Sequence, residues 1–342
     1  MSQEQSNPFN DFFSEITEKI EDLKNIVNTQ TPKIIEQTTK STGETLDWIA
    51  KNPVLRATDK VIGLDWLMTF LGQADFQEIQ ARVKQMRSQY PQDTPHQIAQ
   101  RLIMQKTWDG GRLGLLTNIV PPVAALFLGI ELIATTKLQT EMVYEIASAY
   151  GLDLTQPARR GEVLAIFGLS LGADVLKTGM TIVELIPGIG AVIGASTNAA
   201  LLYVLGQTAC RFYEAKTSQT AVKSLNQATS VDWEIAMAQS QIMDRILTHM
   251  VKISYPNQDW SEVLPTIKKI SPDSVDIIAE NLEQPSDLTE LLNQLIPEFA
   301  PLTLNRCYEI ANSTGEITPK EQEVLSQIAI RFNLDITSII NV

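Results

Sequence analysis

The sequence predicts an all-α protein. Apolar residues recur every three to four positions along most segments, whereas the alternating β-branched runs between Asn-Gly turns that are typical of strands are missing. Small and apolar residues also crowd the stretch from Leu113 to Cys210, where charges are few. Such a stretch either packs tightly as helices or enters a lipid bilayer. We therefore expect a glycine-rich central helical bundle, preceded by amphipathic helices and followed by a C-terminal helical domain.

The length of 342 residues suits two or three domains. We expect N-terminal amphipathic helices over residues 1–57, an apolar helical domain over 58–217 and an acidic helical domain over 218–342. The first ten residues lack a basic region followed by an apolar run, and the two cysteines lie far apart without a partner motif. These features indicate a reducing, cytoplasmic setting.

The net charge of -13 is unevenly placed. Residues 1–30 carry 2 basic and 6 acidic groups, residues 31–217 carry 17 of each, and residues 218–342 carry 8 basic and 17 acidic groups. Binding to nucleic acid needs Lys and Arg to displace counterions from the phosphates. The acidic C-terminal segment therefore argues against a nucleic-acid partner, and a solvated surface is the ordinary explanation of its charge.

Two helices are expected at the N-terminus. The first has an acidic polar face, which disfavours anionic lipid, so it should dock on its own protein, with an intermolecular coiled coil as the alternative. The second is polar and should run from Pro32 to about Ala50, because the residue before Pro53 is pushed out of the α region. The first helix has a heptad seam of Phe9, Phe13, Ile16, Ile20, Leu23 and Val27.

Three further helices should precede the apolar stretch. Thr94 is a good N-cap for the third, with Pro95 at its first position and Gln97 placed to close a capping box. This helix should reach about Thr107, and Gly110-Gly111 should prevent it from continuing. The expected ranges are 59–71, 75–89 and 95–107.

A long helix should follow Pro121-Pro122 and end at Tyr150, with Gly151 as a left-handed cap. Its first half, residues 123–134, is apolar and calls for full burial. From Lys137 onward the pattern predicts one face in water. The polar residues that should mark that face are Gln139, Glu141, Glu145 and Ser148.

Two more helices complete the central region, over about 162–177 and about 190–216, separated by a short segment that Pro187-Gly188 interrupts. The second carries small residues on two adjacent ridges, which would let a partner helix approach closely. These ridges are Gly190, Gly194 and Asn198, and Ala191, Ala195 and Ala199.

The apolar pieces are too short or too interrupted for simple membrane spans. A spanning helix needs about 20 apolar residues, and acids such as Glu131, Asp174 and Glu184 are costly in a bilayer. A soluble core that touches the membrane, an inserted hairpin and two true spans stay open as alternatives. The residues expected to contact membrane or a packed helix are Pro121, Pro122, Phe127, Pro187, Gly188, Gly190 and Gly194.

Motifs for chemistry are weak. Ser170 lies in a Gly-x-Ser-x-Gly pattern, but a nucleophile elbow needs a strand before the serine, and the surrounding spacing is helical. The glycines of residues 188–194 lack the βαβ context of a dinucleotide site. Neither zinc spacing nor a thiolate cluster exists. We expect no catalytic residue, cofactor or metal, although five C-terminal acids could meet around a hard cation: Asp259, Glu262, Glu316, Glu321 and Glu323.

The central region contains three motifs: Gly110-Gly111, Glu145 to Gly151 and Ile186 to Ala191. In these motifs it resembles the EcsC-like family and the apolar helical domain appended to some bacterial dynamin- or Era-type GTPases. The resemblance spans about residues 75–217. It implies a bacterial, membrane-associated helical protein without a defined catalytic site, linked to transport, secretion or envelope stress. No GTPase P-loop is present.

The C-terminal region contains a weak repeat, in which residues 250–278 and 308–340 both read as helix, acidic loop and helix. The second copy, whose loop Glu316 to Glu321 enters an apolar-striped helix, resembles the TerB-like (tellurite-resistance) family. That family usually has Asp-Gly in the loop, where this chain has Thr314-Gly315. A metal role therefore does not carry over with the resemblance.

Together these features predict a non-enzymatic adaptor or stress-response protein at the cytoplasmic face of the membrane, peripheral or partly inserted. Its expected partners are membrane lipid or a membrane protein, and homo-oligomerisation stays open. The alternatives are a soluble carrier that shields a lipid or other apolar ligand and a serine hydrolase that uses Ser170.

Overall fold

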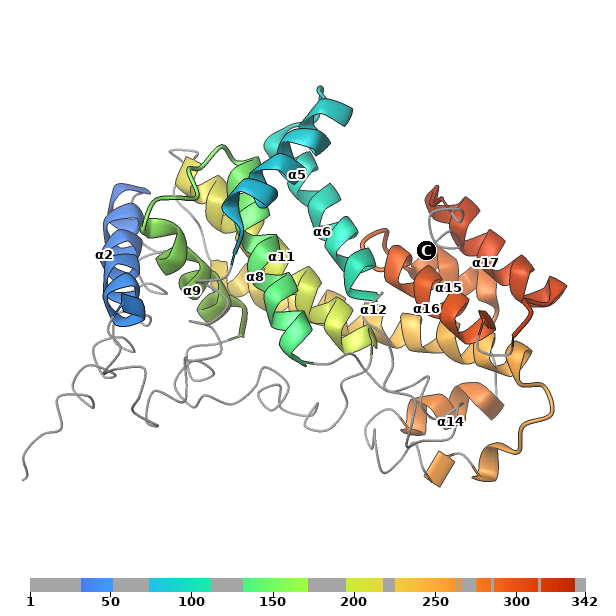
Figure 1. Ribbon diagram of the computed structural model, residues 1–342. Helices are drawn as coiled ribbons and strands as arrows, with labels where there is room; N and C mark the ends of the chain where they lie inside the picture. Colours follow the sequence, from blue (N-terminus) through green and yellow to red (C-terminus); the bar gives the residue numbers. More distant parts are fainter. Residues whose placement is uncertain are drawn as a thin grey trace, which may run out of the picture. The chain divides into compact units, whose positions relative to one another are not determined.

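The computed structural model describes residues 32–51, 74–111, 132–171, 195–217, 225–262, 264–265, 275–283, 286–312 and 315–335. Every regular element in these ranges is an α-helix, so the all-α prediction is confirmed for this part of the chain (Figure 1). The helices are α2 (Pro32–Lys51), α5 (Phe76–Gln89), α6 (Pro95–Gly111), α8 (Leu132–Ala149), α9 (Ala158–Leu171), α11 (Ala195–Thr217), α12 (Leu225–Ser254), α14 (Val275–Glu283), α15 (Leu288–Gln294), α16 (Ala300–Asn312) and α17 (Pro319–Phe332).

The chain forms two compact units that alternate along the sequence. Unit 1 comprises residues 1–99, 139–185 and 205–230, and unit 2 comprises 100–138, 186–204 and 231–342. The boundaries fall inside α6, α8, α11 and α12, so each of these helices contributes residues to both units. The division expected from composition, at residues 57 and 217, stays a prediction.

Several helix ends follow the local signals in the sequence. The Asp75 carboxylate accepts from the backbone N–H groups of Gln77 and Glu78 and caps α5. Thr94 and Gln97 exchange the two hydrogen bonds of a capping box at the start of α6.

The end of α8 also follows the prediction. Gly151 is left-handed at φ +79°, and the Leu152 N–H donates to the carbonyl of Ala147, as in a Schellman motif.

Two predicted helix ends are wrong. The helix α6 continues through Gly110-Gly111, four residues beyond the expected end at Thr107, because glycine costs a helix only about 1 kcal/mol and does not by itself terminate it. The helix α9 begins at Ala158 rather than at Glu162. Its first turn is basic, at Arg159 and Arg160, and these residues lie ahead of the apolar run that marked the helix in the sequence.

The prediction of a wet face on the second half of α8 is also wrong. Gln139 and Glu145 are buried, and Glu141 and Ser148 are half-buried. The helix α5 supplies the cover: the Arg82 guanidinium bonds to Glu145 and Glu141. The pattern of one helix could not show this partner, which lies about 60 residues earlier.

No described helix combines the length and hydropathy that crossing a bilayer requires. The two most apolar segments, residues 112–131 and 172–194, lie outside the described residues. The heptad helix of residues 9–27 and the helix expected over 59–71 also lie outside the described residues. Of the small-residue ridges, only Ala195, Asn198 and Ala199 are described. All seven residues expected to contact membrane or a packed helix lie outside the described residues as well: Pro121, Pro122, Phe127, Pro187, Gly188, Gly190 and Gly194.

Within unit 1, α2 crosses α9 at very short range. A Cβ added at Gly161 would lie 2.0 Å from the carbonyl oxygen of Thr39, and one added at Gly43 would lie 1.9 Å from that of Pro157. Thr39 and Thr42 are buried in α2, and each hydroxyl donates to a carbonyl one turn earlier, at 2.9 Å. The crossing therefore brings two backbones together through small or internally satisfied side chains.

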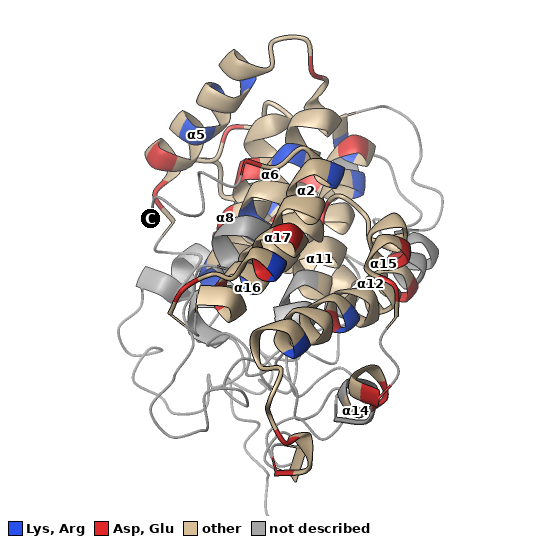
Figure 2. Ribbon diagram, turned by 90° about the vertical axis from the view of Figure 1, so that its right-hand side faces the viewer, with Lys and Arg blue, Asp and Glu red and all other residues tan. Residues whose placement is uncertain are grey.

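Unit 2 has a core in which α12 packs with α15, α16 and α17. Phe299, which is 1% exposed, lies with its ring 5.6 Å from that of Tyr203. The Gln239 side chain of α12 mimics a backbone group: its amide donates to the Gln294 carbonyl, and its oxygen accepts from the Ile296 N–H. Asp and Glu residues lie on α14, α15 and α17 (Figure 2).

Candidate functional site

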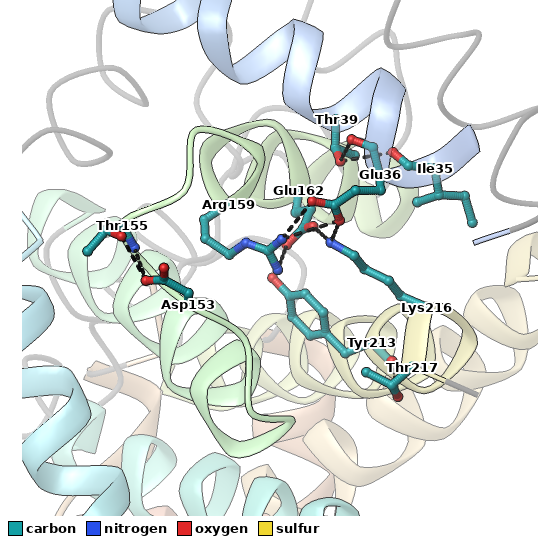
Figure 3. A network of polar contacts seen from close by, with 10 residues as sticks. All are labelled: Ile35, Glu36, Thr39, Asp153, Thr155, Arg159, Glu162, Tyr213, Lys216 and Thr217. Carbon is teal, nitrogen blue, oxygen red and sulfur yellow. Dashed lines mark hydrogen bonds and ion pairs between the residues drawn. The ribbon is translucent and has the colours of Figure 1, made fainter. Parts of the chain in front are cut away.

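The strongest polar feature of unit 1 is a group of four charged side chains from three helices, called here the ion-pair cluster. Glu36 comes from α2, Arg159 and Glu162 come from α9, and Lys216 comes from α11 (Figure 3). The Tyr213 side chain of α11 points into the same group. Arg159 and Glu162 lie three residues apart, as do Tyr213 and Lys216, so each pair shares one face of its helix.

The contacts form a closed network. Arg159 Nη1 lies 2.8 Å from Glu162 Oε2, and Arg159 Nη2 lies 3.4 Å from both carboxylate oxygens of Glu36. The Lys216 ammonium contacts both Glu36 and Glu162. Each cation thus faces both carboxylates.

The cluster lies in the interior. Side-chain exposure is 0% for Glu162, 2% for Arg159 and 6% for Lys216, whereas Glu36 is 35% exposed. Two positive and two negative groups balance, which limits the cost of burying them. Burial raises the pKa of the Glu162 carboxyl, and Lys216 and Arg159 oppose that rise.

Two tyrosines border the cluster. Tyr213 and Tyr144 are both 0% exposed, and the Tyr213 hydroxyl faces the Glu162 carboxylate. Burial raises the pKa of each phenol, and the negative charge of Glu162 adds to the effect. Both tyrosines therefore stay protonated and offer a donor inside the protein.

A second polar group joins α5 to α8. Arg82 donates from Nε to Glu145 at 2.7 Å, from Nη2 to Glu141 at 3.2 Å and from Nη1 to Glu78 at 2.6 Å. Glu145 is 1% exposed and Glu78 is 64% exposed. Arg82 thus compensates one buried carboxylate and two more accessible ones.

A third group lies nearer the surface of unit 1. His96 Nδ1 lies 2.8 Å from Glu214 Oε1, and the Tyr150 hydroxyl donates to the same oxygen at 3.0 Å. Burial raises the pKa of Tyr150, and Cys210 and Glu214 add to the rise. His96 and Glu214 are each nearly half exposed.

Ser170 lies in the last turn of α9 and is buried. It therefore occupies a helix rather than the strand-to-helix turn of a nucleophile elbow. Gly172, the last glycine of that pattern, and the glycines of residues 188–194 lie outside the described residues.

Two of the five C-terminal acids, Asp259 and Glu321, make local contacts. Asp259 accepts from the backbone and hydroxyl of Ser261. Glu321 closes a capping box with Thr318 and contacts the Ser254 hydroxyl. Within the described ranges, no three His, Cys, Asp or Glu side chains are arranged to hold a metal ion. The acids therefore do not meet in one cluster.

The sequence did not single out the ion-pair cluster. The only hint in the sequence is that these charges stand at the ends of apolar helical segments. Arg159 and Glu162 directly precede the apolar run of α9, and Lys216 follows the apolar run of α11. Which charges meet depends on how the helices pack.

The described residues form an all-helical bundle in which buried ion pairs link neighbouring helices. Compared with known protein families, curated proteins and solved structures, the chain shows no match.

Proposed function

We propose that the protein acts by binding, as a non-enzymatic adaptor or stress-response factor at the cytoplasmic face of the membrane. Residues 113–131 and 172–194 would make the contact with lipid or a membrane protein. The first segment holds a single charged residue, Glu131, and the second holds Asp174, Lys177 and Glu184.

The observation that carries the proposal is the burial of the helices next to these segments. From Met142 to Ala147, α8 is buried on all sides, and α9 is buried from Gly161 to Ser170. The two segments add a long apolar stretch with few charges to the sequence next to these buried helices, and such a stretch is typical of a membrane or protein contact.

Flotation with liposomes tests the proposal. The full-length protein should rise with the lipid at low salt, and Phe127→Asp should reduce the floating fraction severalfold, because an acid enters the apolar segment. Ile330→Asp is the matched control, since Ile330 is 81% exposed on α17, and it should float like the wild type. Circular dichroism should show the same helix content for all three proteins.

The protein would not be a membrane-surface factor if it stayed at the bottom of the gradient and in the supernatant of detergent-free lysates. Lipid in the mass spectrum of protein purified without detergent would instead favour a carrier. An esterase activity that Ser170→Ala abolishes without unfolding would favour a hydrolase.

A further inference from the structure

Glu36 differs from the other members of the ion-pair cluster in its helix and in its exposure. The three others belong to α9 and α11 and are at most 6% exposed, whereas Glu36 belongs to α2 and is 35% exposed. The cluster thus reaches solvent at Glu36. A molecule in solution could reach the cations where this side chain now lies.

Without Glu36, the remaining groups would favour an anion. Arg159 and Lys216 carry two positive charges, and Glu162 supplies one negative charge, so one buried positive charge is left without compensation. The buried Tyr213 hydroxyl, which faces Glu162, adds a neutral donor to the same group (Figure 3). Arg159 Nε is a further buried donor that makes no hydrogen bond in the described structure.

We propose that Arg159, Lys216 and Tyr213 form a binding site for a small carboxylate. In the folded protein the Glu36 carboxylate of α2 occupies this site. In the intact chain Glu36 is tethered next to the site, so its effective concentration there exceeds that of a free competitor. When the Glu36 carboxylate is removed, a small carboxylate from solution takes its place between the two cations.

Chemical rescue of Glu36→Ala in the full-length protein tests this site. Truncation to alanine removes the carboxylate and leaves space for acetate. We expect E36A to unfold roughly 3–8 °C below the wild type, because a buried positive charge loses its partner. Acetate should raise the unfolding midpoint of E36A more than sodium chloride at the same ionic strength.

Three proteins serve as controls. Glu36→Gln fills the same space with a neutral amide, so it should be destabilised but should not respond specifically to acetate. Glu44→Ala removes another α2 carboxylate, which is 58% exposed and 4.0 Å from Lys40, and it should neither lose stability nor respond. The wild type should show equal midpoints in acetate and chloride.

The site would be refuted if E36A were as stable as E44A, or if acetate and chloride acted equally on E36A. If E36A is unfolded in chloride, the comparison moves to refolding followed by circular dichroism. Acetate should then restore helix that chloride does not. Equal helix content in the two salts would overturn the proposal.

Discussion

Gly161 of α9 lies against the backbone of Thr39 in α2, so closely that a Cβ at residue 161 would stand 2.0 Å from the Thr39 carbonyl oxygen. The obstacle is backbone, which cannot rotate away as the end of a flexible side chain can. The crossing of these two helices therefore requires that residue 161 carry no Cβ, as residue 43 carries none.

Gly161→Ala should weaken the attachment of α2 to α9. We expect a loss of about 1–3 kcal/mol or more in the free energy of unfolding, since the helices must move apart to admit the methyl group. Urea unfolding measures the loss, and limited proteolysis shows whether cleavage of α2 becomes faster.

Lys40→Ala is the control for this change, because Lys40 is 60% exposed on the same helix. Its stability should stay within about 0.5 kcal/mol of the wild type. Equal stability of Gly161→Ala and Lys40→Ala would contradict the close crossing.

Arg82→Met should destabilise unit 1 through Glu145. The substitution removes the Arg82 guanidinium from a carboxylate that is 1% exposed, at a cost of about 3 kcal/mol. Glu78→Gln removes an exposed partner of the same arginine and should cost less than about 0.5 kcal/mol. The two variants are compared by chemical unfolding, and a similar loss in both would show that Glu145 does not depend on Arg82.

Gln239→Leu should loosen the end of α15. The variant deprives the Ile296 N–H and the Gln294 carbonyl of their partners at 2.8 Å and 3.0 Å, and each unsatisfied group costs about 1–3 kcal/mol. Amide hydrogen exchange at Ile296 should accelerate more than at the α16 core. Unchanged protection at Ile296 would mean that the side chain is dispensable.

Protonation of His249 should lower the free energy of unfolding of unit 2 in mild acid. Burial lowers its pKa from the ordinary 6.5, with Lys252 acting in the same direction and Asp287 opposing. The unfolded chain therefore binds the proton more readily, so the unfolding free energy rises with pH just below 6.5 and levels off above it. His249→Asn should reduce that slope.

An NMR titration checks the direction of this shift. The chain has two histidines, so the spectrum of His96→Asn assigns the His249 ring signals. A midpoint at or above 6.5 for His249 would contradict the prediction.

Helix ends that depend on neighbouring atoms could be predicted from the sequence. Thr94 and Gly151 act on backbone groups a few residues away, and the structure confirms both. The wet face of α8 was predicted wrongly because its cover, Arg82, lies 63 residues before Glu145. A periodic pattern reports the polarity of a side chain, whereas burial also depends on a partner that can neutralise it.

The ion-pair cluster is harder still to predict. Glu36 and Arg159 are separated by 123 residues, and Glu162 and Lys216 by 54. Each of these residues alone is typical of a solvated helix surface. Only the packing of three helices makes them neighbours.

The paired glycines also set the register of α2. Sliding this helix along α9 by one turn would bring Thr39 or Asp47 to the place of Gly43, where the Pro157 carbonyl leaves no room for a Cβ. A shift of α2 by one turn is therefore excluded. An insertion or deletion within α2 between Glu36 and Gly43 would separate the charge contact from the glycine contact, and sliding could not restore both.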